Sequence, residues 1–139
     1  MYSVTSDSTR IDFDAVYRGL TATYWAKGMP AETLRKAIAN SLCFSIFKGD
    51  AQVAFGRVIT DRATYAYLSD VFVIEAERGN GLSKMMMEAV MAHPDLQGLR
   101  RFALLTKDAH TLYERFGFTP SKNPEWYMEI VNRDVYKKP

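Results

Sequence analysis

The spacing of hydrophobic residues near the start of the chain predicts two helices. In the first, apolar side chains recur every three or four residues, with Asp12 as the capping residue and Gly28 at the end. These apolar positions are Phe13, Val16, Tyr17, Leu20 and Tyr24. The second helix covers 30–41, where Pro30 suits the first turn. Its inward positions are Leu34, Ala37 and Ile38.

A period of two then replaces the helical period. Alternating residues predict an antiparallel meander of three strands, joined by short turns, over 42–47, 51–59 and 64–73. The later pattern predicts a helix, a buried strand, a short helix and a last strand, over about 82–93, 100–106, 108–116 and 126–131. Asp108 is the expected cap of the short helix, and Gly117 its end. The tail, 132–139, shows no clear period and is left unassigned.

This order of elements predicts an α+β fold around one mixed sheet, with residues 1–139 in a single domain. Two strands joined through a helix lie parallel if they share a sheet, with a right-handed crossover. The strands over 64–73 and 100–106 should therefore be parallel neighbours. In such sheets ligands bind beyond the carboxyl ends of the strands. Residues 77–84 lie at that end.

Composition narrows the classes of function. The chain is 47% hydrophobic with a net charge of +2, which favours a folded protein without a nucleic-acid or membrane partner. Cys43 is the only cysteine and is joined only by His93 and His110, so the sequence offers no Cys/His metal cluster. No stretch has the pattern of a signal peptide or a spanning helix. A cytoplasmic protein is therefore expected.

The stretch ERGNGLSK, residues 77–84, places two glycines at the start of a helix. Because Gly79 and Gly81 lack β-carbons, the loop can curl with its N–H groups facing one point, beside the positive end of the helix dipole. Arg78 and Lys84 add positive charge. The loop therefore suits a phosphate, although a plain tight turn has the same composition. A Walker loop needs its lysine directly after the second glycine, and a dinucleotide fingerprint needs a third glycine.

Two motifs resemble signatures of the GCN5-related N-acetyltransferases, the GNAT family. RGNGLS after DVFV resembles the R/Q-x-x-G-x-G/A motif, and DAHTLYERFGF resembles a second signature, a helix with a tyrosine before Gly-Phe. The element order matches over the whole chain, and YWAKGMPAETLRKAIANSLCF and GRVITD resemble a subgroup of small bacterial members. The chain departs from the family at Ser83, which stands for Gly or Ala, and at Thr106, which stands for an asparagine.

The resemblance implies acetyl-CoA as co-substrate, without a metal. In this family the third meander strand and the next parallel strand splay apart, and the pantetheine arm pairs with the open strand. In this sequence the open strand is supplied by Val71, Phe72 and Val73. The pyrophosphate would bind the loop, at residues Arg78, Gly79, Asn80, Gly81, Leu82, Ser83 and Lys84. Thr106 is the remaining predicted cofactor-binding residue, beside the pantetheine arm.

The resemblance also implies direct attack of an acceptor amine on the thioester, whose carbonyl a backbone N–H near Val71 would polarise. Tyr113 would donate a proton to the CoA sulfur as general acid; the alternative is a core tyrosine. Asp70 is the candidate base, directly or through an ordered water, and its side chain should point to the opposite face of the strand from Val71. The alternative is an ordinary salt-bridged aspartate. His110 is interpreted as a surface residue and Cys43 as a small buried one.

In this family the first two helices and their connection form the acceptor side, so Tyr24 and Trp25 are the predicted substrate-binding residues. An aromatic wall suits an amine with an apolar or cationic body, although both rings could belong to the core. The acceptor stays open among a small amine, an amino acid, an antibiotic and a protein N-terminus, with a small molecule favoured. The protein is expected as a monomer or homodimer. Two rival functions are a catalytically silent CoA-binding sensor and an acetyltransferase that acts on a protein amine.

Overall fold

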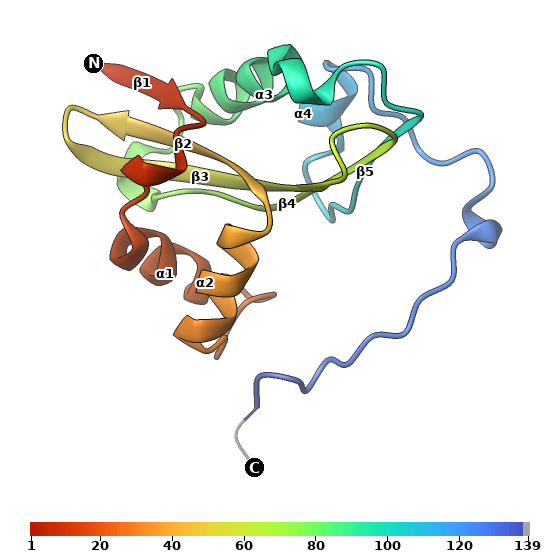
Figure 1. Ribbon diagram of the computed structural model, residues 1–139, viewed down its shortest axis with the longest axis horizontal. Coiled ribbons are helices and arrows are strands. Elements are labelled where there is room, and N and C mark those ends of the chain that lie inside the picture. The colour runs from red at the N-terminus through yellow and green to blue at the C-terminus, as the bar shows by residue number, and fades with distance from the viewer. Residues whose placement is uncertain (138–139) are drawn as a thin grey trace.

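The computed structural model describes residues 1–137 and contains one five-stranded sheet between two layers of helices (Figure 1). From one edge to the other, the strands are β1 (Tyr2–Thr5), β2 (Leu42–Lys48), β3 (Ala51–Thr60), β4 (Tyr65–Val73) and β5 (Arg101–Leu104). One face carries α1 (Phe13–Thr21) and α2 (Ala31–Ala39). The other carries α3 (Leu82–Ala92) and α4 (His110–Glu114).

The pairing of the strands confirms the predicted mixed sheet. Strands β2, β3 and β4 form the antiparallel meander, and β4 and β5 are parallel neighbours connected through α3. The sequence pattern did not reveal β1, which pairs antiparallel with β2 from Tyr2↔Lys48 to Thr5↔Ser45. With only four residues, β1 is too short for its alternation to stand out.

Each face of the sheet buries its own core. Between the sheet and α1 and α2 lie Val16, Leu20, Ala26, Met29, Leu34, Cys43 and Phe55. Between the sheet and α3 lie Leu42, Phe44, Ile46, Val53, Ala54, Val58, Ala66, Leu68, Leu82, Met86, Met87, Val90 and Leu96. Burying one such large side chain contributes about 1.5–3 kcal/mol, so the two cores fix both helix layers to the sheet.

The first two helices form largely as predicted. Asp12 caps α1, because its Oδ1 accepts a hydrogen bond of 3.2 Å from the N–H of Ala15. The helix ends at Thr21, earlier than Gly28, and the chain reaches α2 through irregular turns. Gly28 has a φ of +85°, in the left-handed region that glycine adopts freely. Tyr24 therefore lies in a connection rather than on a helix.

Two predictions near the end of the chain were wrong. Asp108 does not cap α4; instead the hydroxyl of Thr106 accepts a hydrogen bond of 3.0 Å from the N–H of Ala109. The predicted strand over 126–131 has no strand partner among residues 1–137, and the chain there is extended after a helical turn at Pro124–Trp126. Alternation alone cannot make a strand, because a strand also needs an edge to pair with.

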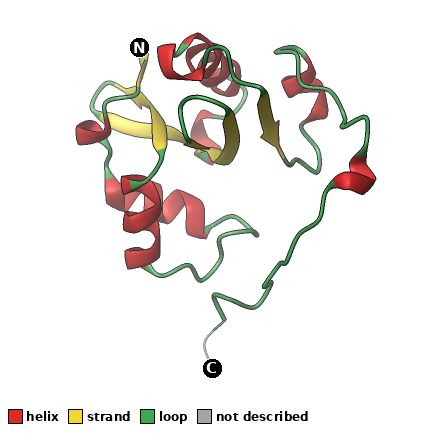
Figure 2. Cartoon of the chain, turned by 45° about the vertical axis from the view of Figure 1, so that its right-hand side comes forward, coloured by secondary structure: helices red, strands yellow, loops and turns green. Residues whose placement is uncertain are grey.

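The segment after α4 runs out from the sheet as an irregular chain with one short helical turn, as Figure 2 shows. Residues 138 and 139, the end of the tail that the sequence left unassigned, lie outside the described range. No helix within residues 1–137 combines the length and the apolar character needed to cross a bilayer.

Candidate functional site

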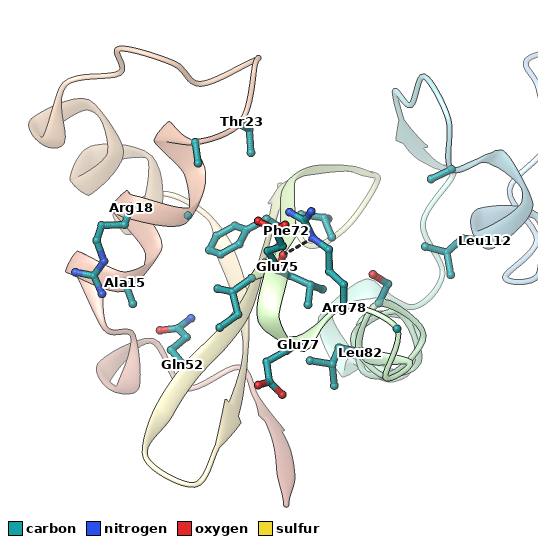
Figure 3. Close-up of a pocket in the computed structure, with 18 of the residues that line it drawn as sticks. Ala15, Arg18, Thr23, Gln52, Phe72, Glu75, Glu77, Arg78, Leu82 and Leu112 are labelled. Atoms are coloured by element: carbon teal, nitrogen blue, oxygen red, sulfur yellow. Dashed lines mark hydrogen bonds between the residues drawn. The ribbon is translucent and has the colours of Figure 1, made fainter.

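The central feature of the site is a gap where β4 outruns its parallel neighbour. Pairing between β4 and β5 runs from Tyr65↔Arg101 to Leu68↔Leu104 and stops there, while β4 continues to Val73. The side of β4 that faced β5 is therefore free beyond Leu68, which confirms the predicted splay. A cleft of about 980 Å³ opens at this point (Figure 3).

Four segments line this cleft, and they come from distant parts of the sequence. The end of β4 supplies Val71, Phe72 and Val73, and the glycine loop and start of α3 supply Arg78, Gly79, Gly81, Leu82 and Ser83. The wall opposite comes from α1 and the connection after it, including Arg18, Gly19, Tyr24 and Trp25. Ala109, Leu112 and Tyr113 come from α4 and the residue before it. The structure thus brings together most of the site residues that the sequence predicted.

A β-bulge reshapes β4 at the edge of the cleft. Phe55 pairs with Phe72 and Arg57 with Ser69, so one residue of β3 opposes two residues of β4, and Asp70 is the extra one. Asp70 has a φ of +56°, which is uncommon for a residue with a side chain. A bulge bends its strand and increases the local twist, and this one lies directly after Leu68, where the pairing of β4 with β5 stops.

The bulge places Asp70 on the face of the sheet that carries α1 and α2. Its Oδ2 accepts from Arg57 Nε at 2.8 Å, and its Oδ1 accepts from Trp25 Nε1 at 3.1 Å. Val71 instead packs against the α3 core, which confirms the predicted opposite faces. Asp70 is buried and does not line the cleft itself. Its contacts are those of the salt-bridged aspartate that the sequence left as the alternative.

The same network fixes one wall of the cleft. Arg57 also donates from Nη1 to the Ser41 hydroxyl at 3.1 Å, so the α2 layer, β3 and β4 are joined around the indole of Trp25. The Trp25 ring is half exposed and meets the Tyr24 ring edge to face at 5.2 Å between centroids. Lys107, from the connection after β5, lies 4.4 Å from the centre of the Tyr24 ring. These aromatic side chains belong to the cleft, whereas Tyr17 is held in the core by a hydrogen bond to the Met29 carbonyl.

The glycine loop at the other end of the cleft leaves a helix start without a cap. Gly79 and Gly81 have φ values of +85° and +75°, and an added β-carbon at either would meet open space rather than protein. Gly81 is the residue before α3, and no side chain in the described part of the chain caps the N–H groups of the first turn. Those groups and the positive end of the dipole are available to an anion.

Charged residues hold this loop against the sheet. Arg78 Nε donates to the Val73 carbonyl at 3.1 Å, across the floor of the cleft, as the dashed line in Figure 3 marks. Glu77 accepts from the Tyr2 hydroxyl at 2.5 Å and lies 3.3 Å from Lys48 Nζ. The hydrogen bond from Tyr2, followed by Lys48, holds the pKa of Glu77 below its usual range. Since Glu77 is committed to these partners, its charge at the cleft mouth is partly neutralised.

Tyr113 faces the cleft from α4. Its ring lies 6.1 Å from that of Phe118, edge to face, and its hydroxyl has no hydrogen-bond partner among residues 1–137. Desolvation raises the pKa of the phenol above its ordinary value of 10.0, and the negative charge of Asp108 raises it further. The hydroxyl is therefore protonated at neutral pH and free to donate toward the cleft.

Some predicted site residues lie outside the lining. Asn80 donates from its amide to the Glu77 carbonyl at 3.0 Å, which shapes the loop, and Lys84 does not line the cleft. Thr106 is engaged at the start of α4. Cys43 is buried, and burial raises its thiol pKa to about 11, as expected for a core residue rather than a nucleophile. His110 is an exposed residue at the start of α4.

Other residues of the site were not predicted. Gln52 lines the cleft from β3 and accepts from the Asp12 N–H at 2.8 Å, and Arg57 pairs with Asp70. Gly19 faces Phe72 so closely that a β-carbon there would lie 2.2 Å from the ring. The one sequence feature that could have revealed these residues is Arg57, which is the only charged residue in its predicted strand, 51–59. Among residues 1–137 no group of three or more His, Cys, Asp or Glu side chains could hold a metal.

The sequence of this chain is similar to that of known and candidate acetyltransferases. The sequence profile described as "Acetyltransferase (GNAT) domain" matches residues 39–120. A candidate acetyltransferase of the fungus Gibberella zeae is 30% identical over 135 residues, covering 81% of this chain and 75% of its own length.

Solved structures extend the likeness to the whole chain. A crystal structure of a candidate GNAT acetyltransferase from Xanthomonas campestris is 50% identical, covers 99% of this chain and 98% of its own, and has a TM-score of 0.96. Because 99% of this chain is aligned, the match includes nearly all of the segment after α4. A protein of Clostridium acetobutylicum, crystallised with acetyl-CoA, shares the fold at a TM-score of 0.69 and 12% identity, covering 94% of this chain and 96% of its own.

Proposed function

Because the chain belongs to the GNAT family of acetyltransferases, we propose that it moves the acetyl group of acetyl-CoA to an amine. The observation that carries this proposal is the juxtaposition in one cleft of three features. These are an unpaired strand edge at Val71–Val73, an uncapped helix start behind Gly81, and the phenol of Tyr113. Each suits a different part of a CoA thioester.

The chain's own groups fit the two ends of the cofactor. N–H groups of the loop and of the first turn of α3 suit the negatively charged pyrophosphate, with Arg78 adjacent. The free edge of β4 suits the amides of pantetheine, as an added strand would. In this structure Arg78 occupies the Val73 carbonyl, so we expect it to release that carbonyl when the cofactor pairs there.

In the proposed reaction the amine nitrogen bonds to the acetyl carbon, the carbon–sulfur bond breaks, and the leaving sulfur takes a proton. Tyr113 is the proposed donor of that proton. A raised pKa keeps its hydroxyl protonated, and the hydroxyl has no other partner in the described chain. A backbone N–H near Val71 is the proposed donor to the thioester oxygen.

Asp70 remains the proposed base, directly or through a water, for the proton that the amine must lose. Both of its oxygens already accept hydrogen bonds, from Arg57 and Trp25. Asp70 would therefore have to exchange one of these contacts to accept a proton, and an ordered water between it and the amine avoids that exchange. The buried pair with Arg57 also gives Asp70 a structural role, which the experiment below separates from the chemical one.

The acceptor is proposed to lie against Tyr24 and Trp25, on the α1 side of the cleft. Both rings line the cleft and are exposed by 67% and 45%, so an acceptor could contact their faces. The cleft is walled by α1 and by the connection after it, which favours a small amine over a protein N-terminus. Location in the cytoplasm and the absence of nucleic-acid and membrane partners stay predictions.

A panel of amines, including peptides with free N-termini, tests this proposal. Release of free CoA thiol from acetyl-CoA is measured with each acceptor, and binding of acetyl-CoA is measured separately by calorimetry. Thiol release that depends on a small amine supports the proposal. Release only with peptides favours the protein acetyltransferase. Tight binding without release from any amine favours a silent CoA-binding module, and no binding of acetyl-CoA would overturn all three.

A further inference from the structure

The side chain of Lys107 joins the two sides of the cleft at its rim. Lys107 lies in the connection between β5 and α4, and its Nζ stands 4.4 Å from the centre of the Tyr24 ring. Tyr24 belongs to the connection after α1, on the other side of the cleft, where Figure 3 shows Thr23 lying across from Leu112 of α4. The lysine therefore brings a primary amine to the rim of the cleft, from the side that also carries Tyr113.

No other lysine among residues 1–137 has this position. None of these lysines lines the cleft, and Lys107 alone places its ammonium on a ring that does. Lys48 lies over the ring of Tyr2, outside the lining, and also pairs with Glu77. Lys107 is exposed and forms no ion pair within the described chain. Its ammonium rests on the Tyr24 ring, and a contact of this kind is weak at an exposed site and readily exchanged.

The ring that holds this amine lies next to the proposed reacting centre. Tyr24 meets Trp25 edge to face at 5.2 Å between centroids, and the Trp25 indole donates to Asp70 Oδ1 at 3.1 Å. Both rings line the same cleft as Tyr113. Because a lysine side chain has a flexible four-carbon stem, its nitrogen can turn from the ring into the cleft without movement of the backbone. Lys107 thus presents, at the proposed acceptor wall, the functional group of an acceptor.

We infer that Lys107 is acetylated by the acetyl-CoA bound in the cleft of its own chain when no free amine is present. The inference rests on the proposed function, because the donor and the cleft are the same. The ammonium first gives one proton to water. Its nitrogen then bonds to the acetyl carbon and the carbon–sulfur bond breaks. The nitrogen loses a second proton as the sulfur gains one, so the products are an uncharged acetyl-lysine and one CoA thiol per chain.

This reaction differs from hydrolysis of acetyl-CoA in its end point. An amide nitrogen does not attack a second thioester, so each chain consumes one acetyl-CoA at Lys107 and then stops. Hydrolysis would continue. Acetylation also removes the positive charge from the Tyr24 ring, and with it the cation–π contact that joins the two sides of the cleft.

Mass spectrometry of the full chain tests the inference. The native protein is incubated without an acceptor in acetyl-CoA that carries a deuterated acetyl group. The label should enter Lys107 at least about tenfold faster than Lys122, because only Lys107 is held beside the bound thioester. Lys122 is an exposed lysine after α4 and measures the spontaneous reaction. In denaturant the two rates should be equal. Dilution of the native protein in saturating acetyl-CoA should leave the rate per chain unchanged, since the reaction takes place within one chain.

Thiol release without an acceptor gives a second readout. The native protein should release about one thiol per chain in a first phase, and Lys107→Arg should lack that phase. Arginine keeps a cation for the Tyr24 ring, but its guanidinium does not lose the proton that attack requires. Lys122→Arg is the matched control and should keep the phase. The buried thiol of Cys43 should not contribute.

The same preparations are assayed with the panel of amines, which tests the proposed function separately. If thiol release follows a free amine while Lys107 stays unlabelled, the inference is overturned and the proposed function stands. Equal labelling of Lys107 and Lys122 in the native protein overturns it as well, because the reaction is then spontaneous. A rate per chain that rises with protein concentration overturns it by showing transfer between chains. If acetyl-CoA does not bind, the proposed function and the inference fail together.

Discussion

Replacing Tyr113 by phenylalanine removes one oxygen from the cleft and leaves the ring in place. The hydroxyl has no hydrogen-bond partner among residues 1–137, while the ring packs on Phe118. Loss of the oxygen should therefore change the free energy of unfolding by no more than about 1 kcal/mol. If the phenol is the general acid, turnover should fall by roughly 10²–10⁴-fold. That loss corresponds to about 2.7–5.4 kcal/mol of barrier, at about 1.36 kcal/mol per tenfold.

The two effects are large enough to separate in one pair of measurements. Thiol release gives turnover with little background, because burial raises the pKa of the Cys43 thiol to about 11. The melting temperature gives stability. Tyr65→Phe is the control, since Tyr65 is exposed and lies outside the lining of the cleft. Normal turnover in Tyr113→Phe, with or without lower stability, would refute the assignment of the general acid.

The pH profile offers a second test of Tyr113. A general acid acts only while it is protonated, so activity should be present below its pKa and decline above it. Because desolvation and Asp108 raise that pKa, the alkaline decline should lie above pH 10, the ordinary value for tyrosine. The decline should be absent from whatever activity the phenylalanine variant retains. A decline below pH 10 that persists in the variant would mean that another group causes it.

The other predictions concern the loop, the bulge and the cysteine. Gly81→Glu should abolish acetyl-CoA binding in calorimetry, because it brings a negative charge to the anion site. The control is Gly49→Glu, at an exposed turn glycine with a φ of +59°, which should leave binding unchanged. Equal affinity in the two variants would show that the loop is not part of the site. Asp70→Asn should lower turnover most at the lower pH values, where the acceptor amine is protonated and needs a base. It should also lower the free energy of unfolding by about 3–5 kcal/mol, because Arg57 loses its buried partner. If stability falls while the pH profile of turnover keeps its shape, Asp70 is structural and the base lies elsewhere. Cys43 should resist a thiol reagent at pH 8 in the native protein and react once denaturant is added; rapid native reaction would contradict its burial.

The sequence predicted those parts of the fold whose signal is local. A hydrophobic period of three to four residues predicted three helices, and a period of two predicted the meander. The two glycines, together with the two motifs, predicted the loop and the cleft. Tyr2–Thr5 was missed because four residues give too short an alternation. A strand over 126–131 was predicted from its alternating pattern and is not formed, because a strand also needs the free edge of a sheet to pair with.

The rest of the site depends on contacts that no local pattern encodes. Arg57 and Asp70 are 13 positions apart, and only the bulge brings both to the same face. The contact between Trp25 and Asp70 spans 45 positions. A positive φ at an aspartate cannot be read from the neighbouring residues, although aspartate tolerates it better than most. Pairings of this kind arise only when the layers assemble.

The bulge at Asp70 consists of a single extra residue, so an in-frame deletion of one codon would remove it. Before the bulge, Ala66 and Leu68 face α3, and Ser69 faces the layer of α1 and α2. After the bulge, Val71 and Val73 face α3, and Phe72 faces α1. Val71 to Val73 would keep these faces if Asp70 were deleted, because β4 would then alternate without interruption. What the deletion would remove is the bend, so the straightened strand could continue to pair with its parallel neighbour and close the cleft. An in-frame deletion of the Asp70 codon is therefore expected to lengthen the pairing of β4 with β5 and to narrow the cleft.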